Sequence, residues 1–539
     1  MNTWLLRLAF ILCLFPAFPS SATTHYVDPG SSGPVAPYSS WATAATNIQD
    51  AVDASSSGDL VLVTNGTYAT GGRAPAPGFL TNRLTVTVPI TIQSVNGPAV
   101  TIIQGYQLPG PTNGNAAIRC VYLTNGASLS GFTLTGGATH LFTGAVSNDV
   151  LGGGIWCAST NVIISNCIVV SNLADYGGGG IYGGSIFNSS ISNNNFEEIP
   201  SIPSQGDGGG AFQSYLQNCT LFRNRACYGG GVSQSTLQNC NLLGNEGNAG
   251  GGAFASTLNN CSLIGNLGNY SGGGAQLGAL INCLVLSNSA IQSVAFSMIL
   301  GNGAGAASNS LYNCTVIGNH GLNGTFDCTN YNSIVYSNMN TDDQGSTFTY
   351  CCTSASESGL GNITHAPLFV GSTNFQLQSN SPCINAGNNL YVMGSADLNG
   401  NPRISGATVD IGAYEFQNPA SLISYAWLEQ YGLATDGSAD YADTDGNGMK
   451  NWQKWVAGLN PTNPASILQM MPPASSGTNL VVTWQSVPNI NYFLQRSSSL
   501  APGSFQPLAT NIPGQTGTTS YTDTNAPAPG PWYYRVGVP

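Results

Sequence analysis

Charged side chains are scarce in this 539-residue sequence, which has 11 Lys and Arg and 23 Asp and Glu, or 6% of the chain. Ordinary soluble domains carry about a quarter charged residues, so this scarcity excludes most helical and mixed α/β cytosolic enzymes. The formal net charge of −12 also shows that the basic excess typical of proteins that bind nucleic acid or anionic membranes is missing. We therefore expect no nucleic-acid partner.

Long apolar runs are also missing, apart from one at the N-terminus. The run from Leu8 to Phe18 follows Arg7 and precedes small residues at positions 20–22. It is too short for a membrane span and is typical of a secretory signal peptide, here residues 1–22. No other stretch is apolar enough to cross a bilayer. We expect a secreted or cell-surface protein with no transmembrane segment, and a monomer.

Glycine, by contrast, is abundant, with 69 residues, and apolar residues make up 42% of the chain. The polar residues are mainly Asn, Ser and Thr, which favour turns and backbone-bonded corners over helix interiors. The apolar fraction is sufficient for a large core. This composition predicts an all-β fold.

One unit recurs every 21 to 22 residues: a glycine cluster, a short strand, an Asn-Cys or Asn-Ser pair and, five residues after the Cys or Ser, another Asn. Three strand-like pieces per unit and no helical segment fit one coil of a parallel β-helix, in which equivalent residues stack about 4.8 Å apart. The pairs are Asn166-Cys167, Asn188-Ser189, Asn218-Cys219, Asn239-Cys240, Asn260-Cys261, Asn282-Cys283, Asn313-Cys314 and Asn332-Ser333. The second asparagines are Asn172, Asn194, Asn224, Asn245, Asn266, Asn288, Asn319 and Asn338.

With these units, residues 23–417 resemble right-handed parallel β-helix proteins of the pectate-lyase-like superfamily, and the units themselves are similar to polymorphic outer-membrane-protein repeats. Residues 374–416 resemble the closing segment of β-helix proteins described as choice-of-anchor Q. The resemblance implies a solenoid fold and, for the pectate lyases, a cluster of calcium-binding carboxylates with an Arg base. A fold of this kind hosts many functions, so it does not by itself define one.

The cysteines of the repeat fall in one column of the solenoid. A disulfide or metal ladder and a stack of buried thiols are the two interpretations. Stacked coils keep neighbouring Cβ atoms about 4.8 Å apart, which is longer than disulfides accept, and no His or acidic residues accompany the column as metal ligands would. The sequence therefore predicts buried, unbridged thiols.

Three insertions interrupt the repeat at the same corner, between Gly137 and Gly152, after Asn194 and after Asn288. Because the last two lie four coils apart, they would flank a trough about 19 Å long, enough for a short oligosaccharide. Arg225 and Glu246 share a column on its floor, where they form either a surface ion pair or part of a polysaccharide site. The candidate catalytic residues are Asp207, Arg223, Arg225 and Glu246, and the candidate sugar-binding residues are Tyr228 and Tyr270.

The two ends of the chain differ from the repeat. Ile48, Ala51 and Val52 have helical spacing before a strand at Leu60 to Val63, which predicts an amphipathic cap on the solenoid. Residues 418–466 resemble helix–loop–helix calcium modules related to dockerin and thrombospondin type-3 repeats. Residues 467–539 alternate with period 2 between Pro/Gly turns and resemble a fibronectin type III-like sandwich.

A calcium-type loop lies in the helical module. Asp443-x-Asp445-x-Asn447-Gly448 places oxygen donors at every second residue, as a hard cation requires, although the twelfth position is Lys454 instead of Glu. Calcium binding and a plain turn are both open. The candidate ligands are Asp443, Asp445, Asn447 and Met449.

Two functions remain open at this point. The first is an exported, non-catalytic protein that binds glycans or the cell envelope through loops on one edge of the solenoid. The second is a calcium-assisted polysaccharide lyase or a glycosidase that acts in the trough. An enzyme should show at least two carboxylates within about 5 to 9.5 Å, or a carboxylate cluster with Arg, facing an open groove.

Overall fold

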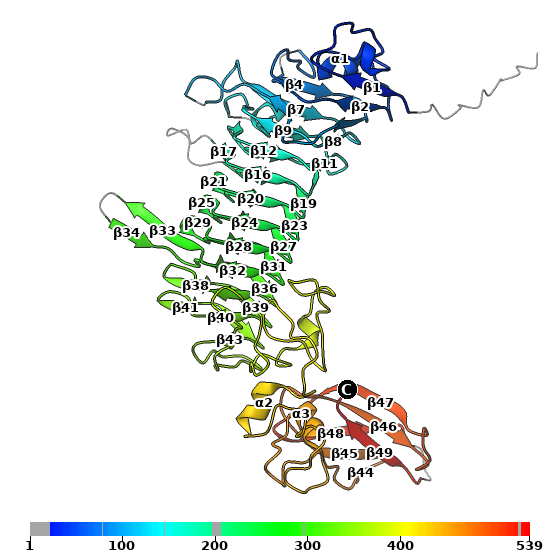
Figure 1. The fold of residues 1–539 in the computed structure, drawn as a ribbon. Helices are drawn as coiled ribbons and strands as arrows, with labels where there is room; N and C mark the ends of the chain where they lie inside the picture. Colours follow the sequence, from blue (N-terminus) through cyan, green and yellow to red (C-terminus); the bar gives the residue numbers. More distant parts are fainter. Residues whose placement is uncertain are drawn as a thin grey trace, which may run out of the picture.

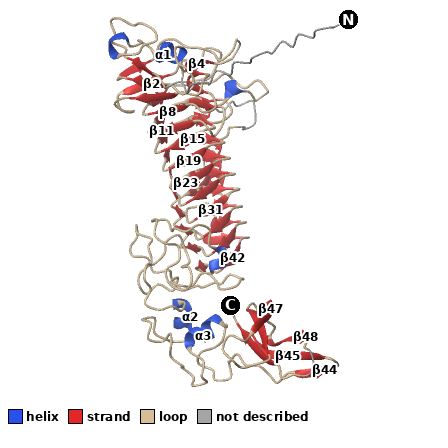
Figure 2. Ribbon diagram, turned by 90° about the vertical axis from the view of Figure 1, so that its right-hand side faces the viewer, coloured by secondary structure: helices blue, strands red, loops and turns tan. Residues whose placement is uncertain are grey.

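The computed structural model describes residues 22–77, 79–110, 112–144, 146–196, 206–294, 297–526 and 530–539. The predicted signal peptide lies outside the described residues except for Ala22. Residues 24–353 form a stack of parallel coils, which we call the solenoid, and the rest of the chain lies beside and beyond its C-terminal end (Figures 1 and 2). The fold is thus a parallel β-helix, as the repeat predicted.

Four sheets make the walls of the solenoid. Sheet 1 has 13 strands, from β1 (Thr24–Val27) to β42 (Thr347–Thr349), and sheet 2 has 11, from β4 (Thr81–Val86) to β41 (Thr341–Gln344). Sheet 3 has 12 strands, from β3 (Gly66–Tyr68) to β43 (Cys352–Thr353). Sheet 4 has seven, from β13 (Leu173–Ala174) to β34 (Ser297–Leu300), and its last pair is the antiparallel hairpin of β33 (Ser289–Val294) and β34.

One coil shows how the composition makes the fold. The chain passes through β22 (Val232–Ser233), β23 (Thr236–Gln238), β24 (Asn241–Leu243) and β25 (Glu246–Ala249), one strand in each sheet. Every corner of this coil contains a left-handed residue, and these are Gln234, Asn239, Gly244 and Gly250, with φ of 48°, 52°, 57° and 65°. Gly and Asn are the residues that adopt this conformation most readily, so four such corners per coil explain why both are abundant.

The two asparagine columns have different functions in the fold. The column of Asn239, which directly precedes the Cys, lies at the left-handed corner between sheets 1 and 3, exposed at Asn239 and buried on the last coils. The column of Asn245 is buried, and each side chain bonds to the next coil: Asn224 donates its backbone and side-chain N–H groups to Asn245 Oδ1, both at 3.0 Å. This ladder runs from Asn172 to Asn338 and satisfies polar groups that would otherwise be unpaired inside the solenoid.

The cysteine column is a stack of buried thiols, as predicted. Cys219 N donates to Cys240 Sγ at 3.4 Å, Cys240 N donates to Cys261 Sγ at the same distance, and none of the column is bridged. Burial raises the pKa of Cys167 to about 11, so this thiol stays protonated. The column packs with buried leucines such as Leu237 in the continuous core.

The N-terminal end is covered by α1 (Ile48–Asp53), which buries Ile48, Ala51 and Val52 against the first strands, including β2 (Leu60–Val63). The closing segment, residues 374–416, was expected to cap the other end, but it also lies along the side of the last coils. There it buries the corner asparagines and bonds to them: Asn282 donates to Ala396 O at 3.1 Å, and Asn332 donates to Asn388 O at 2.9 Å.

Beyond the solenoid come two short helices, α2 (Tyr425–Gln430) and α3 (Asn451–Val456), and two antiparallel sheets. Trp484, Tyr492 and Leu494 are buried between these sheets. One sheet contains β44 (Ala474–Ser476), β45 (Asn479–Ser486) and β48 (Gly517–Asp523), and the other contains β47 (Gln506–Pro513), β46 (Asn491–Ser497) and β49 (Tyr533–Gly537).

Candidate functional site

The predicted trough lies on sheet 4, along one edge of the solenoid (Figure 1). Its floor is made by β21 (Arg225–Tyr228), β25 and β29 (Leu267–Ser271), which lie between β17 (Asn195–Phe196) and the β33–β34 hairpin in the strand order. The insertions after Asn194 and Asn288 are therefore four coils apart, as expected. Residues 197–205 of the first of these lie outside the described residues, so the trough is characterised here by its floor.

Arg225 and Glu246 are paired in register on neighbouring strands, and Arg225 Nε lies 3.4 Å from Glu246 Oε1. Their side chains are 58% and 37% exposed, so solvent screens the attraction. Asn269 on the next coil donates to Glu246 Oε1 at 3.4 Å. The structure thus brings together one Arg and one carboxylate, which is the ion pair that the column predicted.

The other two candidate catalytic residues lie apart from this pair. Asp207 pairs with Tyr228 at the far end of β21, and its Oδ1 accepts a hydrogen bond from Ser233 at 2.8 Å. Partial burial raises the pKa of Asp207, and the bond from Ser233 opposes that shift. Three residues along the strand and two coils separate Asp207 from Glu246, which places their Cα atoms about 14 Å apart.

Arg223 lies at the corner before β21, with a φ of 53°, at the position that Gly244 and Gly265 occupy on the next coils. Its guanidinium carbon lies 5.5 Å from the centroid of the Phe222 ring. Neither Asp207 nor Arg223 joins the Arg225–Glu246 pair. Catalysis by these four residues stays a prediction, with a single exposed ion pair as its geometric basis.

The two candidate sugar-binding tyrosines differ in exposure. Tyr228 is half-buried and its ring centroid lies 4.9 Å from that of Phe254, so one face is already covered. Tyr270 is 55% exposed on the trough floor. Tyr270 is therefore the residue of the trough with an accessible aromatic surface.

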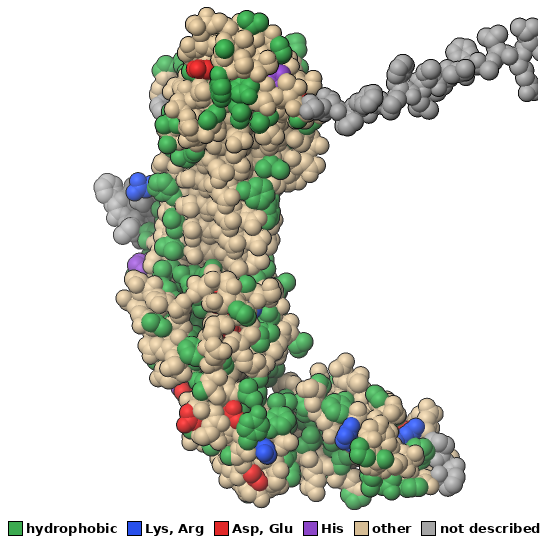
Figure 3. Space-filling view, turned by 45° about the vertical axis from the view of Figure 1, so that its right-hand side comes forward, with side chains coloured by type: hydrophobic (Ala, Val, Ile, Leu, Met, Phe, Trp, Pro, Cys, Tyr) green, Lys and Arg blue, Asp and Glu red, His purple; other side chains and the backbone are tan. Residues whose placement is uncertain are grey.

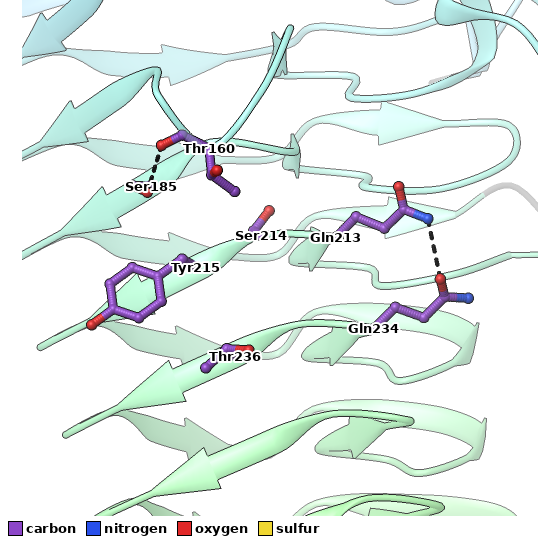
Figure 4. Close-up of a pocket in the computed structure, with 7 residues that line it drawn as sticks. All are labelled: Thr160, Ser185, Gln213, Ser214, Tyr215, Gln234 and Thr236. Atoms are coloured by element: carbon purple, nitrogen blue, oxygen red, sulfur yellow. Dashed lines mark hydrogen bonds between the residues drawn. The ribbon is translucent and has the colours of Figure 1, made fainter.

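A second hollow, which the sequence did not reveal, lies at the corner of sheets 1 and 2 (Figure 4). We call it the Tyr215 groove, and its volume is about 490 Å³. It crosses the starts of β15 (Ser185–Phe187), β19 (Tyr215–Gln217) and β23. Its lining residues are Thr160, Ser185, Gln213, Ser214, Tyr215, Gln234 and Thr236.

The side chains of the Tyr215 groove are ordered by bonds between coils. Tyr182 donates its hydroxyl to Gln213 Oε1 at 3.1 Å, and Gln213 Nε2 donates to Gln234 Oε1, also at 3.1 Å. The Tyr215 hydroxyl lies 3.3 Å from the amide oxygens of both Gln217 and Gln238. Figure 4 shows the bonded Gln213 and Gln234 amides on one side of the groove and the Tyr215 ring on the other.

The upper rim of the groove comes from an irregular turn. Residues 158–162 connect β10 (Ile155–Cys157) to β11 (Ile163–Ser165), whereas two residues make the same corner between β22 and β23. Thr160 lies in this longer turn, and its carbonyl accepts a hydrogen bond from Ser185 at 2.8 Å. The extra residues of this turn are the sequence feature that could have predicted the groove. The turn is shorter than the insertions that predicted the trough.

The chemistry of the groove follows from its lining. It contains hydroxyls, carboxamides and a phenol, and no carboxylate, cation or imidazole. Figure 3 shows that charged side chains are also sparse over the visible face of the solenoid. Such a surface can hydrogen-bond and stack, and the Tyr215 phenol is the one side chain of the lining that could act in acid–base catalysis.

Comparison with known proteins gives a fold-level likeness. No protein-family model and no curated protein sequence matches the chain. Among solved structures, a pectate lyase is similar over 74% of this chain and 97% of its own, at 16% identity and a TM-score of 0.37. A rhamnogalacturonan lyase and a carrot pectin methylesterase each cover 65% of this chain at 12% identity, with 90% and 91% of their own chains covered and TM-scores of 0.34 and 0.29. A likeness at these scores does not assign a function to this chain.

The predicted calcium loop lies between α2 and α3. Asp443, Asp445, Asn447 and Met449 share this loop, and Asp445 pairs with the ammonium of Lys454. Among all the residues that the structure describes, no three His, Cys, Asp or Glu side chains converge as metal ligands do. Calcium binding by the loop stays a prediction.

In the part of the chain that the structure describes, no helix combines the length and the apolar character that crossing a bilayer requires.

Proposed function

We propose that this chain is an exported β-helix protein that binds an uncharged glycan in the Tyr215 groove without cleaving it. The observation that carries the proposal is the lining of the groove, where amides and hydroxyls from successive coils lie with one tyrosine ring, and no carboxylate, ammonium, guanidinium or imidazole is among the lining residues. Sugars present hydroxyl groups and apolar ring faces, which amides and an aromatic ring complement.

The spacing of the groove supports an extended ligand. Thr160, Ser185, Tyr215 and Thr236 come from four successive coils, so the groove follows the solenoid axis for roughly 14 Å. A polymer that lies along this axis meets similar partners on each coil. The apolar run of residues 8–18 supports export, and the resemblance of residues 374–416 to choice-of-anchor Q segments supports a location at the cell surface.

Affinity electrophoresis in gels that contain neutral glycans, with pectin and alginate as acidic comparisons, tests this proposal. We expect retardation by a neutral glycan that is insensitive to salt, because the groove has no charged side chain. Tyr215→Ala should weaken binding about tenfold, which is about 1.4 kcal/mol. Tyr270→Ala is the matched control in the trough and should leave binding unchanged. Loss of binding in Tyr270→Ala alone would show that the trough is the binding surface.

The trough remains a second candidate because Arg225 and Glu246 form an exposed pair on its floor, near Tyr270. If the protein is a lyase or glycosidase, it should depolymerise pectin, alginate or a neutral glycan when calcium is present. Glu246→Gln and Arg225→Ala should then abolish cleavage. Retardation without cleavage by the wild-type protein would favour the binding function.

A further inference from the structure

The loop that resembles a calcium site already uses its oxygens within the protein. Asp443 accepts backbone N–H groups with both oxygens, from Asn447 at 3.1 Å and from Gly448 at 2.8 Å. Asn447 Oδ1 accepts the N–H group of Met449 at 3.0 Å. A bound calcium ion takes six to eight oxygen ligands, so these oxygens would have to serve the ion and their present N–H partners together.

Lys454 supplies a positive charge to the same loop. Its side chain extends from α3, is fully buried, and donates a hydrogen bond from Nζ to Asp445 Oδ2. The side chain of Asp445 is 2% exposed, and Asn460 O lies 3.5 Å from the ammonium. Lys454 occupies the twelfth position of the loop, where calcium loops of this kind have a bidentate Glu.

The Lys454 ammonium and a calcium ion would compete for the same negative charge, that of Asp445. A buried ammonium is stable only with an opposite charge beside it, and Asp445 provides that charge. A divalent cation on Asp445 would displace the ammonium or lie against it, and either arrangement is unfavourable inside the protein. The residues of this loop therefore do not fit a calcium ion while Lys454 is in place.

We propose that the Lys454 ammonium is the internal cation of this loop and that the helical module folds and stays folded without calcium. The Lys454–Asp445 pair connects the loop to α3, and the contact with Asn460 extends this connection to the segment that leads into the sandwich. The junction between the solenoid and the sandwich is consequently ordered at any calcium concentration.

Thermal unfolding of the full chain, followed by tryptophan fluorescence, tests this proposal. Trp452 and Trp455 lie on α3 and report on the module. The wild-type melting temperature should agree within about 1 °C between EDTA and about 10 mM calcium, a concentration at or above the Kd of weak extracellular calcium modules. A wild-type increase of roughly 10 °C that disappears in Asp445→Asn would overturn the proposal.

The variant Lys454→Glu tests the same proposal by an expected gain of calcium response. It removes the ammonium and adds the missing twelfth ligand, so its module should melt early in EDTA and be stabilised by calcium. Lys450→Glu is the matched control, because it makes the same charge change at an exposed position just before α3 and should not create a calcium response. If the Lys454→Glu module does not fold under either condition, the wild-type comparison still decides between the two outcomes.

Discussion

Replacing Asn245 by alanine tests whether the buried asparagine ladder holds the coils together. The Asn245 carboxamide makes four hydrogen bonds: its Oδ1 accepts two from Asn224, and its Nδ2 donates to Leu221 O and to Asn266 Oδ1, all at 3.0 Å. At about 1 kcal/mol for each bond, their loss should reduce the free energy of unfolding by about 3 to 5 kcal/mol. Without Asn245, the buried backbone N–H group of Asn224 also loses its acceptor.

Urea denaturation of the full chain measures the change, and hydrogen exchange of the coils on either side locates it. The effect should be local, because each coil contacts only its neighbours. Asn239→Gly is the matched control: Asn239 is exposed, has a φ of 52° and makes one side-chain bond, to Asn218 at 3.3 Å. Glycine accepts the same φ, so the control should change stability by less than about 1 kcal/mol. Similar small losses in both variants would refute the stabilising role of the ladder.

Two further predictions concern charged residues. Burial raises the pKa of Glu415 to about 7 and, together with repulsion from Glu415, raises that of Asp410. Since Glu titrates near 4.3 when unfolded, the folded state binds more protons, so the melting temperature should fall as pH rises from about 4 to about 7 and then level off. Calorimetry should show a weaker dependence in Glu415→Gln, and equal slopes would contradict this assignment. Arg225→Ala removes an exposed pair with Glu246 and should cost less than about 1 kcal/mol in urea denaturation; a larger loss would show that the pair stabilises the fold.

Periodicity was enough to predict the columns of the solenoid, because equivalent residues of a repeat must stack. It did not distinguish the two asparagine columns, since the same residue type serves both a left-handed corner such as Asn239 and a buried ladder position such as Asn245. The repeat also did not predict how the asparagine ladder ends. Asn338 donates its Nδ2 and backbone N–H groups to Asp342 Oδ1, which lies only four residues later instead of one coil away.

The candidate sites were likewise predictable from the sequence only in part. The sequence predicted that the insertions after Asn194 and Asn288 lie four coils apart and that Arg225 meets Glu246, because both follow from counting residues along the coils. Asp207 was grouped with them because it lies at the return of the first of these insertions, and its side chain bonds to Ser233 on sheet 2. The Tyr215 groove combines residues of four coils that share no motif, so its shape depends on side-chain packing that periodicity does not encode.

The few buried charges of this protein lie where the repeat ends or is interrupted. Inside the repeat, backbone groups form hydrogen bonds with the next coil, so no charged side chain is needed to satisfy them. Arg119 donates instead to Gly152 O, Leu151 O and Asn82 Oδ1, each at 2.8 Å, and thereby fixes an insertion whose carbonyls have left the column. Arg403 pairs with Glu415 at 2.9 Å in the closing segment, and Lys454 pairs with Asp445 in the helical module. The buried charges of Arg119, Arg403 and Lys454 therefore serve the irregular segments, whereas the regular coils satisfy their buried polar groups with asparagine.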